Sequence, residues 1–201
     1  MTGTILCVCT GNLCRSPLLA QVLRTALGPE VRVVSAGTDA AVGGSVPEAT
    51  TRAALALGFG AGLPEHRPRP LDRELVDSAD LVVALAREHR GAVARLSPRA
   101  SRRTFTLLEL GRLAGVMTDR DRSALHERIE DGQAPLAALA VTLAALRGHA
   151  APPASPVDLD VVDPFGAGDG VHAAAAREIV RGGRQLLEVL DDVAGACSVA
   201  A

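Results

Sequence analysis

The hydrophobic positions of this chain follow two patterns that alternate along its first half. Four short apolar runs, bounded by turn residues, have the length and composition of buried strands. They span residues 4–9, 30–35, 80–85 and 103–107. Between them apolar residues recur at helical spacing, for example after Pro17, which suits a first helical turn. Strands alternating with helices predict βαβ units, and therefore an α/β fold with a parallel sheet and helices on both faces.

The second half of the chain has more helical patterning than the first. Residues 111–151 are predicted to be helix-rich, with a strongly apolar stretch at 136–146. A long amphipathic helix then closes the fold. We expect one domain over residues 1–201, with a loose tail after residue 194.

Composition narrows the class of protein. The 201 residues suit one α/β domain, and 48% hydrophobic residues are enough for its core. A net charge of −2 offers no basic face for nucleic acid or for an anionic membrane. No apolar segment is long enough to span a bilayer, and the N-terminus has no basic region of the signal-peptide type. We therefore expect a cytoplasmic protein.

Three of the four cysteines crowd into eight residues, which points to a chemical site. Cys9 opens a Cys-x5-Arg-Ser motif, CTGNLCRS, that lies between a predicted strand and a predicted helix. A loop that leads into a helix N-terminus supplies convergent N–H donors for a phosphate group. Gly11 and Asn12 tolerate the positive φ that such a cradle requires. Arg15 offers a rigid fork for two phosphate oxygens.

Cys9 sits where those N–H groups and the helix dipole converge, so we expect it to react as the thiolate. A thiolate can attack phosphorus and form a phosphocysteine intermediate. The Ser16 hydroxyl can donate to the Cys9 sulfur and help it to leave when water hydrolyses that intermediate.

Two other interpretations of the motif remain open from the residues alone. The cysteines could be small buried apolar side chains, with Arg15 a surface charge. They could also hold zinc, although no histidine or further cysteine stands at ligand spacing, so no metal site is predicted. The strand–turn–helix context favours the phosphate cradle.

A phosphocysteine route needs an acid to protonate the leaving oxygen and then a base to activate water. Asp163 is the candidate, because Pro164 stiffens its loop and Phe165 offers an aromatic face to the substrate. An Asp-Pro pair can also be a simple turn signal. Three nearby carboxylates compete for the role: Asp158, Asp160 and Asp169.

Several motifs together resemble the low-molecular-weight protein tyrosine phosphatases and their arsenate-reductase relatives. They are VCTGNLCRSP at 8–17, SAGT at 35–38, HRPR at 66–69, SADLVV at 78–83 and DPFG at 163–166. The resemblance covers nearly the whole chain except about 111–157, a segment longer than the family usually has, which predicts a helical insertion there. It implies a four-stranded parallel sheet, a phosphate-binding loop after strand 1, and no cofactor.

The resemblance also implies residue roles. Asp163 would be acid and then base, and His66 would support the cradle through a hydrogen bond to Asn12. Cys14 would be a redox-sensitive partner that forms a reversible disulfide with Cys9. The implied catalytic set is Cys9, Arg15 and Asp163, and the implied substrate-binding set is Thr10, Gly11, Asn12, Leu13, Cys14, Ser16 and Phe165.

Substrate signals conflict. Family members that act on phosphotyrosine tend to carry a bulky apolar residue at the position of Leu13, whereas the DPFG motif resembles the phosphoarginine branch. The aromatic residue that often follows the SAGT turn is absent, because DAAV stands at 39–42. We predict a phosphatase acting on phosphotyrosine in proteins. The alternatives are a phosphoarginine or small-molecule phosphate phosphatase, an arsenate reductase, and a non-catalytic phosphate-binding adaptor.

Overall fold

A computed structural model describes residues 1–199 of the chain, with side chains up to residue 194. At its centre four parallel strands form a sheet in the order β2-β1-β3-β4. The strands are β1 (Gly3–Cys9), β2 (Val31–Gly37), β3 (Leu81–Ala84) and β4 (Thr104–Thr106). Each lies within about two residues of an apolar run, so the predicted parallel sheet is confirmed.

The strand order explains where a ligand site can form. From β1 the chain crosses to β2 on one side, and β3 and β4 extend the sheet on the other. Such a reversal leaves a crevice at the carboxyl edge of the sheet, where α/β folds place their ligands. β1 ends at that edge with Cys9, which pairs with Gly37 of β2.

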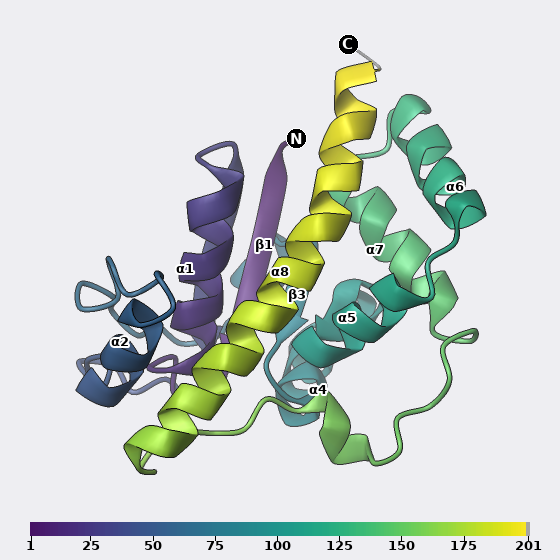
Figure 1. Cartoon of the computed structure of the whole chain (residues 1–201). Coiled ribbons are helices and arrows are strands. Elements are labelled where there is room, and N and C mark those ends of the chain that lie inside the picture. Colours follow the sequence, from purple (N-terminus) through teal and green to yellow (C-terminus); the bar gives the residue numbers. More distant parts are fainter. Residues whose placement is uncertain (200–201) are drawn as a thin grey trace.

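Helices cover both faces of the sheet, as predicted (Figure 1). On one face α1 (Arg15–Leu27) and α5 (Leu107–Gly115) pack against the long α8 (Asp169–Val199). Their apolar side chains join one side of β1 and β3 in the larger core cluster. On the other face α3 (Arg73–Asp77) and α4 (Arg87–Leu96) enclose a smaller cluster with the opposite sides of the same strands. A short helix, α2 (Glu48–Leu55), packs against α8.

The helix-rich segment after α5 forms a pair of helices that belongs to the core. α6 (Asp119–Glu130) and α7 (Pro135–Leu146) pack on each other, and α7 also contacts β1, β3 and α8. Leu136 and Leu139 of α7 are completely buried. Because α7 is apolar on nearly all sides, it needs neighbours all round, which accounts for its position between α6 and the sheet.

Arg147, just after α7, fastens this helical pair to the rest of the fold. Its Nε donates to Glu109 Oε1 at 2.8 Å, and one terminal nitrogen donates to the Thr104 carbonyl at 2.6 Å. Its guanidinium also lies 4.3 Å from the ring centroid of Phe105. The segment is therefore anchored to the first residue of β4 and to Glu109 of α5.

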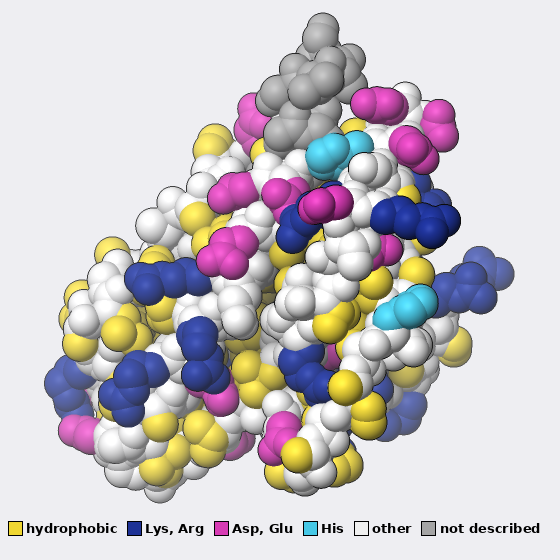
Figure 2. Space-filling view, turned by 45° about the vertical axis from the view of Figure 1, so that its right-hand side comes forward, with side chains coloured by type: hydrophobic (Ala, Val, Ile, Leu, Met, Phe, Trp, Pro, Cys, Tyr) yellow, Lys and Arg dark blue, Asp and Glu magenta, His cyan; other side chains and the backbone are white. Residues whose placement is uncertain are grey.

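At the C-terminal end of the chain, α8 continues as helix to Val199 where the sequence predicted a loose tail after residue 194. Residues 200–201 lie outside the described part. The face that carries α6 and α8 mixes basic, acidic and apolar side chains (Figure 2). No helix in the described part of the chain combines the length and the apolar character needed to cross a bilayer.

Candidate active site

The Cys-x5-Arg motif forms a closed loop between β1 and α1. Cys9 ends the strand, is 2% exposed, and lies at the base of a cavity of about 330 Å³. Among the described non-glycine residues only Asn12 has a positive φ, 54°. α1 begins at Arg15, so the positive end of its dipole lies at the loop that Cys9 opens.

The Asn12 side chain determines the direction of the hydrogen bond between Ser16 and Cys9. Its Oδ1 accepts from the Arg69 N–H at 3.0 Å, so its amide nitrogen must be the donor to Ser16 Oγ, at 2.9 Å. Ser16 Oγ also lies 2.9 Å from the Cys9 sulfur. Since the Ser16 oxygen already accepts from Asn12, its hydroxyl proton is free to donate to a Cys9 thiolate.

His66 supports the loop at the same residue. Its Nε2 lies 2.9 Å from the Asn12 carbonyl, the contact that the resemblance implied, and must carry the proton because a carbonyl only accepts. Burial lowers the pKa of His66, which favours the neutral ring. Asn12 Nδ2 also donates to the buried Ser35 hydroxyl at 3.0 Å, and Arg69 Nε donates to the Ser35 carbonyl at 2.8 Å.

The loop after β2 is bonded to the back of the cradle. Thr38 N donates to the Cys9 carbonyl, Asp39 N to that of Thr10, and Ala41 N to that of Gly11, at 2.9, 3.0 and 3.1 Å. The two backbones approach so closely that a Cβ on Gly37 would lie 2.4 Å from the Thr10 oxygen. Only glycine fits at this position, and this steric restriction explains why the third residue of the SAGT motif is Gly37.

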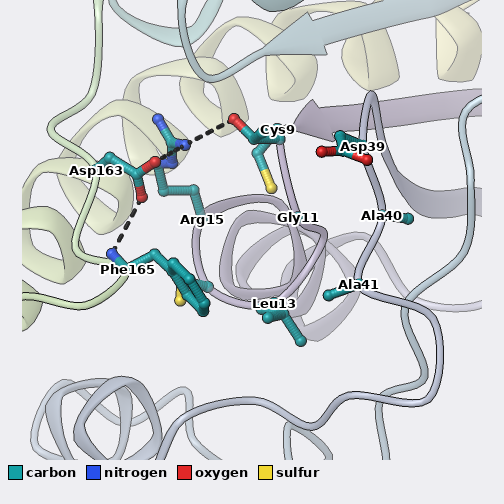
Figure 3. Close-up of a pocket in the computed structure, with 11 residues that line it drawn as sticks. Cys9, Gly11, Leu13, Arg15, Asp39, Ala40, Ala41, Asp163 and Phe165 are labelled. Carbon is teal, nitrogen blue, oxygen red and sulfur yellow. Dashed lines mark hydrogen bonds and ion pairs between the residues drawn. The ribbon is translucent and has the colours of Figure 1, made fainter.

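Arg15 is 4% exposed and points towards the loop that carries Val161 and Asp163. Its Nη2 donates to Asp163 Oδ2 at 2.6 Å and to Thr10 Oγ1 at 3.2 Å, and its Nη1 to the Val161 carbonyl at 3.4 Å. Figure 3 shows the Arg15 guanidinium between Asp163 and the start of the cradle. Asp163 also accepts from the Phe165 N–H at 3.1 Å, so the DPF turn holds its carboxylate at the cavity.

The three rival carboxylates are engaged elsewhere. Asp160 forms a forked pair with Arg87, Asp169 pairs with Arg52, and Asp158 caps the turn at Ser155. Of the four, only Asp163 lines the cavity at Cys9.

The mouth of the cavity has apolar walls with one aromatic ring. Leu13 and Phe165 face each other across the mouth, and Ala40 and Ala41 of the loop after β2 also line it (Figure 3). Phe165 is 65% exposed. Asp39 is the remaining wall residue with a charge besides Arg15 and Asp163.

The structure brings together every side chain that the sequence assigned to the cradle. The cavity is lined by Cys9, Thr10, Gly11, Leu13, Cys14, Arg15, Asp163 and Phe165 among others, with Asn12, Ser16 and His66 just behind it. Burial raises the pKa of Cys14 to about 11 and that of Cys7 to about 12, so both are neutral thiols. In the described part of the chain, no three histidines, cysteines or carboxylates are grouped to hold a metal ion.

Three contributors were missed from the sequence: Ser35, Arg69 and His89. His89 of α4 is 1% exposed, and its Nε2 lies 2.9 Å from Thr10 Oγ1. The available signal was its position, four residues after the apolar run of β3, since β3 neighbours β1 in the sheet. Ser35 and Arg69 lie inside the SAGT and HRPR motifs, and the motifs alone do not indicate which groups these two residues contact.

The fold and the cradle together define a cysteine-dependent phosphatase. The family model described as low molecular weight phosphotyrosine protein phosphatase matches residues 4–115, more than half of the chain. The probable low molecular weight protein-tyrosine-phosphatase AmsI of Erwinia amylovora is 36% identical over 105 residues, 52% of this chain and 71% of that protein. This chain therefore belongs to the low molecular weight phosphotyrosine protein phosphatase family.

Relatives of two named activities occur among the similar proteins. The protein-arginine-phosphatase of Geobacillus stearothermophilus is 40% identical over 107 residues, 53% of this chain and 70% of that protein. The solved YwlE arginine phosphatase from the same organism has a TM-score of 0.63 at 28% identity, covering 94% of this chain and 93% of that one. The crystal structure of Erwinia amylovora AmsI, at 22% identity and a TM-score of 0.64 over 94% of this chain and 93% of that one, shows the same fold.

Proposed function

We propose that this protein hydrolyses phosphomonoesters, with phosphotyrosine in proteins as the substrate, through a phosphocysteine on Cys9. The observation that carries the proposal is the arrangement of Cys9, Arg15 and Asp163 around one cavity. In the first step the Cys9 thiolate bonds to phosphorus as the bond to the leaving oxygen breaks, and protonated Asp163 gives its proton to that oxygen. Arg15 and the loop N–H groups hold the other phosphoryl oxygens.

In the second step water replaces the thiolate. The Asp163 carboxylate takes a proton from water as the water oxygen bonds to phosphorus and the bond to Cys9 breaks. The products are inorganic phosphate and the Cys9 thiolate. The Ser16 hydroxyl, held as a donor by Asn12, stabilises the departing thiolate through the 2.9 Å contact.

The cavity supports an aryl substrate. Leu13 and Phe165 form an apolar slot above the cradle, wide on the side of Ala40 and Ala41. An aromatic ring gains more from such walls than a guanidinium, which would lose its hydration beside Leu13. The arginine phosphatases among the relatives make phosphoarginine the second candidate.

The chemistry is tested with p-nitrophenyl phosphate and no added metal. We expect turnover by the wild-type protein and none by Cys9→Ser, because serine is not ionised at neutral pH. Thermal unfolding of the two proteins should coincide within a few degrees, so that loss of activity cannot be ascribed to unfolding. Turnover retained by Cys9→Ser would overturn the proposed nucleophile.

The substrate is tested by comparing rates on a phosphotyrosine peptide, a phosphoarginine peptide and arsenate with a thiol reductant. A rate on phosphotyrosine at least tenfold above the others supports the proposal. Leu13→Thr should narrow that gap, because it removes the apolar wall beside the leaving group. Equal, negligible rates on all three would point to a small phosphate ester or to a non-catalytic phosphate-binding role.

We also infer a cytoplasmic location, because the mechanism needs Cys9 as a reduced thiol and that compartment keeps thiols reduced.

Cys9 and Cys14 share the cradle, which supports a reversible disulfide between them as a redox switch.

A further inference from the structure

A chain of polar contacts runs from the buried core of α4 into the cradle. His89 Nε2 lies 2.9 Å from Thr10 Oγ1, and the same oxygen accepts from Arg15 Nη2 at 3.2 Å. His89 is 1% exposed, and the mechanism proposed above gives it no part. A buried histidine directed at a loop that holds substrate needs a reason, because its polar atoms lose their hydration.

The contacts of His89 determine which ring nitrogen carries the proton. Its Nε2 lies 3.3 Å from Glu88 Oε1, and a carboxylate only accepts. Its Nδ1 is buried and has no hydrogen-bond partner. Nε2 is therefore the protonated nitrogen and donates to Thr10, while Nδ1 is the bare nitrogen.

The ring stays neutral over the range in which the enzyme is expected to work. Burial, and after it the positive charge of Arg15, lower the pKa of His89 to about 4, although the Asp163 and Asp160 carboxylates act in the opposite direction. A neutral ring avoids a second buried cation beside Arg15.

The Thr10 oxygen therefore accepts two N–H donors, one from His89 and one from Arg15. Two donors use both lone pairs of a hydroxyl oxygen and leave little freedom to rotate. With Thr10 held by His89, Nη2 of Arg15 meets a fixed acceptor on the side away from the Val161 carbonyl. The guanidinium plane is thus fixed from two sides.

We propose that His89 is a positioning residue that acts through Thr10 to hold the Arg15 guanidinium in the plane that binds the phosphoryl group. The proposal rests on the proposed function for the identity of the bound group. Its basis is the geometry of three side chains from three elements: Thr10 after β1, Arg15 at the start of α1 and His89 in α4. Small errors in the placement of a charged hydrogen-bonding group are costly in rate and affinity.

The test combines two variants that remove the contact with one that retains it. His89→Leu removes the donor, and Thr10→Val removes the oxygen while keeping the shape. His89→Gln keeps an amide nitrogen near the position of Nε2. We expect His89→Leu to weaken the binding of inorganic phosphate, and to lower kcat/KM for p-nitrophenyl phosphate, by roughly tenfold, the size of one hydrogen bond to a charged network. His89→Gln should retain most of the phosphate affinity and most of the kcat/KM of the wild type.

The double variant distinguishes positioning from general support of the fold. Once Thr10→Val has removed the oxygen, His89→Leu should cause less than a twofold further loss, because the path to Arg15 is already broken. His126→Leu on α6, a half-buried histidine whose Nε2 is buried without a hydrogen-bond partner, is the matched control and should leave phosphate affinity unchanged. Thermal unfolding of each variant shows whether it is folded under the conditions of the assay.

Two results would overturn the proposal. One is a His89→Leu variant that binds phosphate as tightly as the wild type. The other is a His89→Leu substitution that lowers phosphate affinity by the same factor in the wild-type protein and in the Thr10→Val variant. Phosphate affinity is measured by calorimetry and needs no turnover. A protein without phosphatase activity that still showed the coupling would contradict the proposed function and leave the role of His89 standing.

Discussion

The Arg15 guanidinium and the Asp163 carboxylate are paired, with 2.6 Å between Nη2 and Oδ2. The proposed reaction needs each of them for the substrate: Arg15 to hold phosphoryl oxygens, and Asp163 to carry a proton. A phosphoryl dianion that enters the cradle competes with Asp163 for the same guanidinium. We therefore expect substrate binding to release Asp163 towards the leaving oxygen.

Asp163→Asn removes both the proton-transfer group and the ion pair with Arg15, and the two effects can be measured separately. It should lower kcat by about a hundredfold or more, most strongly for substrates with poor leaving groups, which depend most on protonation. It should also tighten phosphate binding by about threefold to fivefold, because Asp163 is half exposed and its pair with Arg15 contributes about 1 kcal/mol or less. A series of aryl phosphates gives the first result and calorimetry the second.

The control for Asp163 is Asp160→Asn, three residues away and paired with Arg87. That variant should keep the leaving-group dependence of the wild type. If Asp163→Asn slowed all aryl phosphates by the same factor, Asp163 would have a structural role and no part in proton transfer.

Asn12 combines a left-handed backbone with three side-chain hydrogen bonds, to Ser16, Ser35 and the Arg69 N–H. Asn12→Gly and Asn12→Ala remove the same bonds, but only alanine adds the steric penalty of positive φ. We expect both to lower kcat, since Ser16 loses the donor that orients it. Denaturant unfolding should find Asn12→Ala less stable than Asn12→Gly by about 1 kcal/mol. Equal stabilities would mean that the loop relaxes to a negative φ.

The features that the sequence predicted best are those formed by consecutive residues. The cradle is eight consecutive residues whose order defines its chemistry, and the strands around it are short apolar runs. Contacts that join distant segments were harder to foresee. His89 and Thr10 are 79 positions apart, and their pairing depends on the order of β1 and β3 in the sheet. Asp163 and Arg15 are 148 apart, and the residues alone left three nearby carboxylates in competition with Asp163 until the family resemblance favoured it.

Cys14 should react much more slowly with alkylating agents than a free cysteine. Burial raises the pKa of its thiol to about 11, so at pH 8 only about one molecule in a thousand carries the thiolate that reacts. Peptide mapping after iodoacetamide treatment should find Cys9 modified and Cys14 intact at pH 8. Labelling of Cys14 should rise about tenfold per pH unit while the fold persists. Rapid labelling of Cys14 at pH 7 would contradict its burial as a neutral thiol.

We propose that residues 1–201 form one domain, in which the helical segment after residue 115 folds together with the catalytic part. Substitution of Arg147 tests this proposal. The family model ends at residue 115, yet Arg147 bonds to Glu109 and to the carbonyls of Ser101 and Thr104. Arg147→Met should destabilise the protein by about 2 kcal/mol, because Glu109 is 8% exposed and would lose one of its two arginine partners. For a chain of this length that is a fall in Tm of about 4–8 °C, with kcat/KM unchanged.

The matched control for Arg147 is Arg181→Met, which removes an exposed arginine from a pair with Glu178 on α8. Such a pair contributes little, so its Tm should stay within about 1 °C of the wild type. Calorimetry should show one transition that Arg147→Met shifts as a whole, because α7 shares its core with β1 and β3. Two transitions, of which only one moved, would show that the helical segment folds as a separate unit.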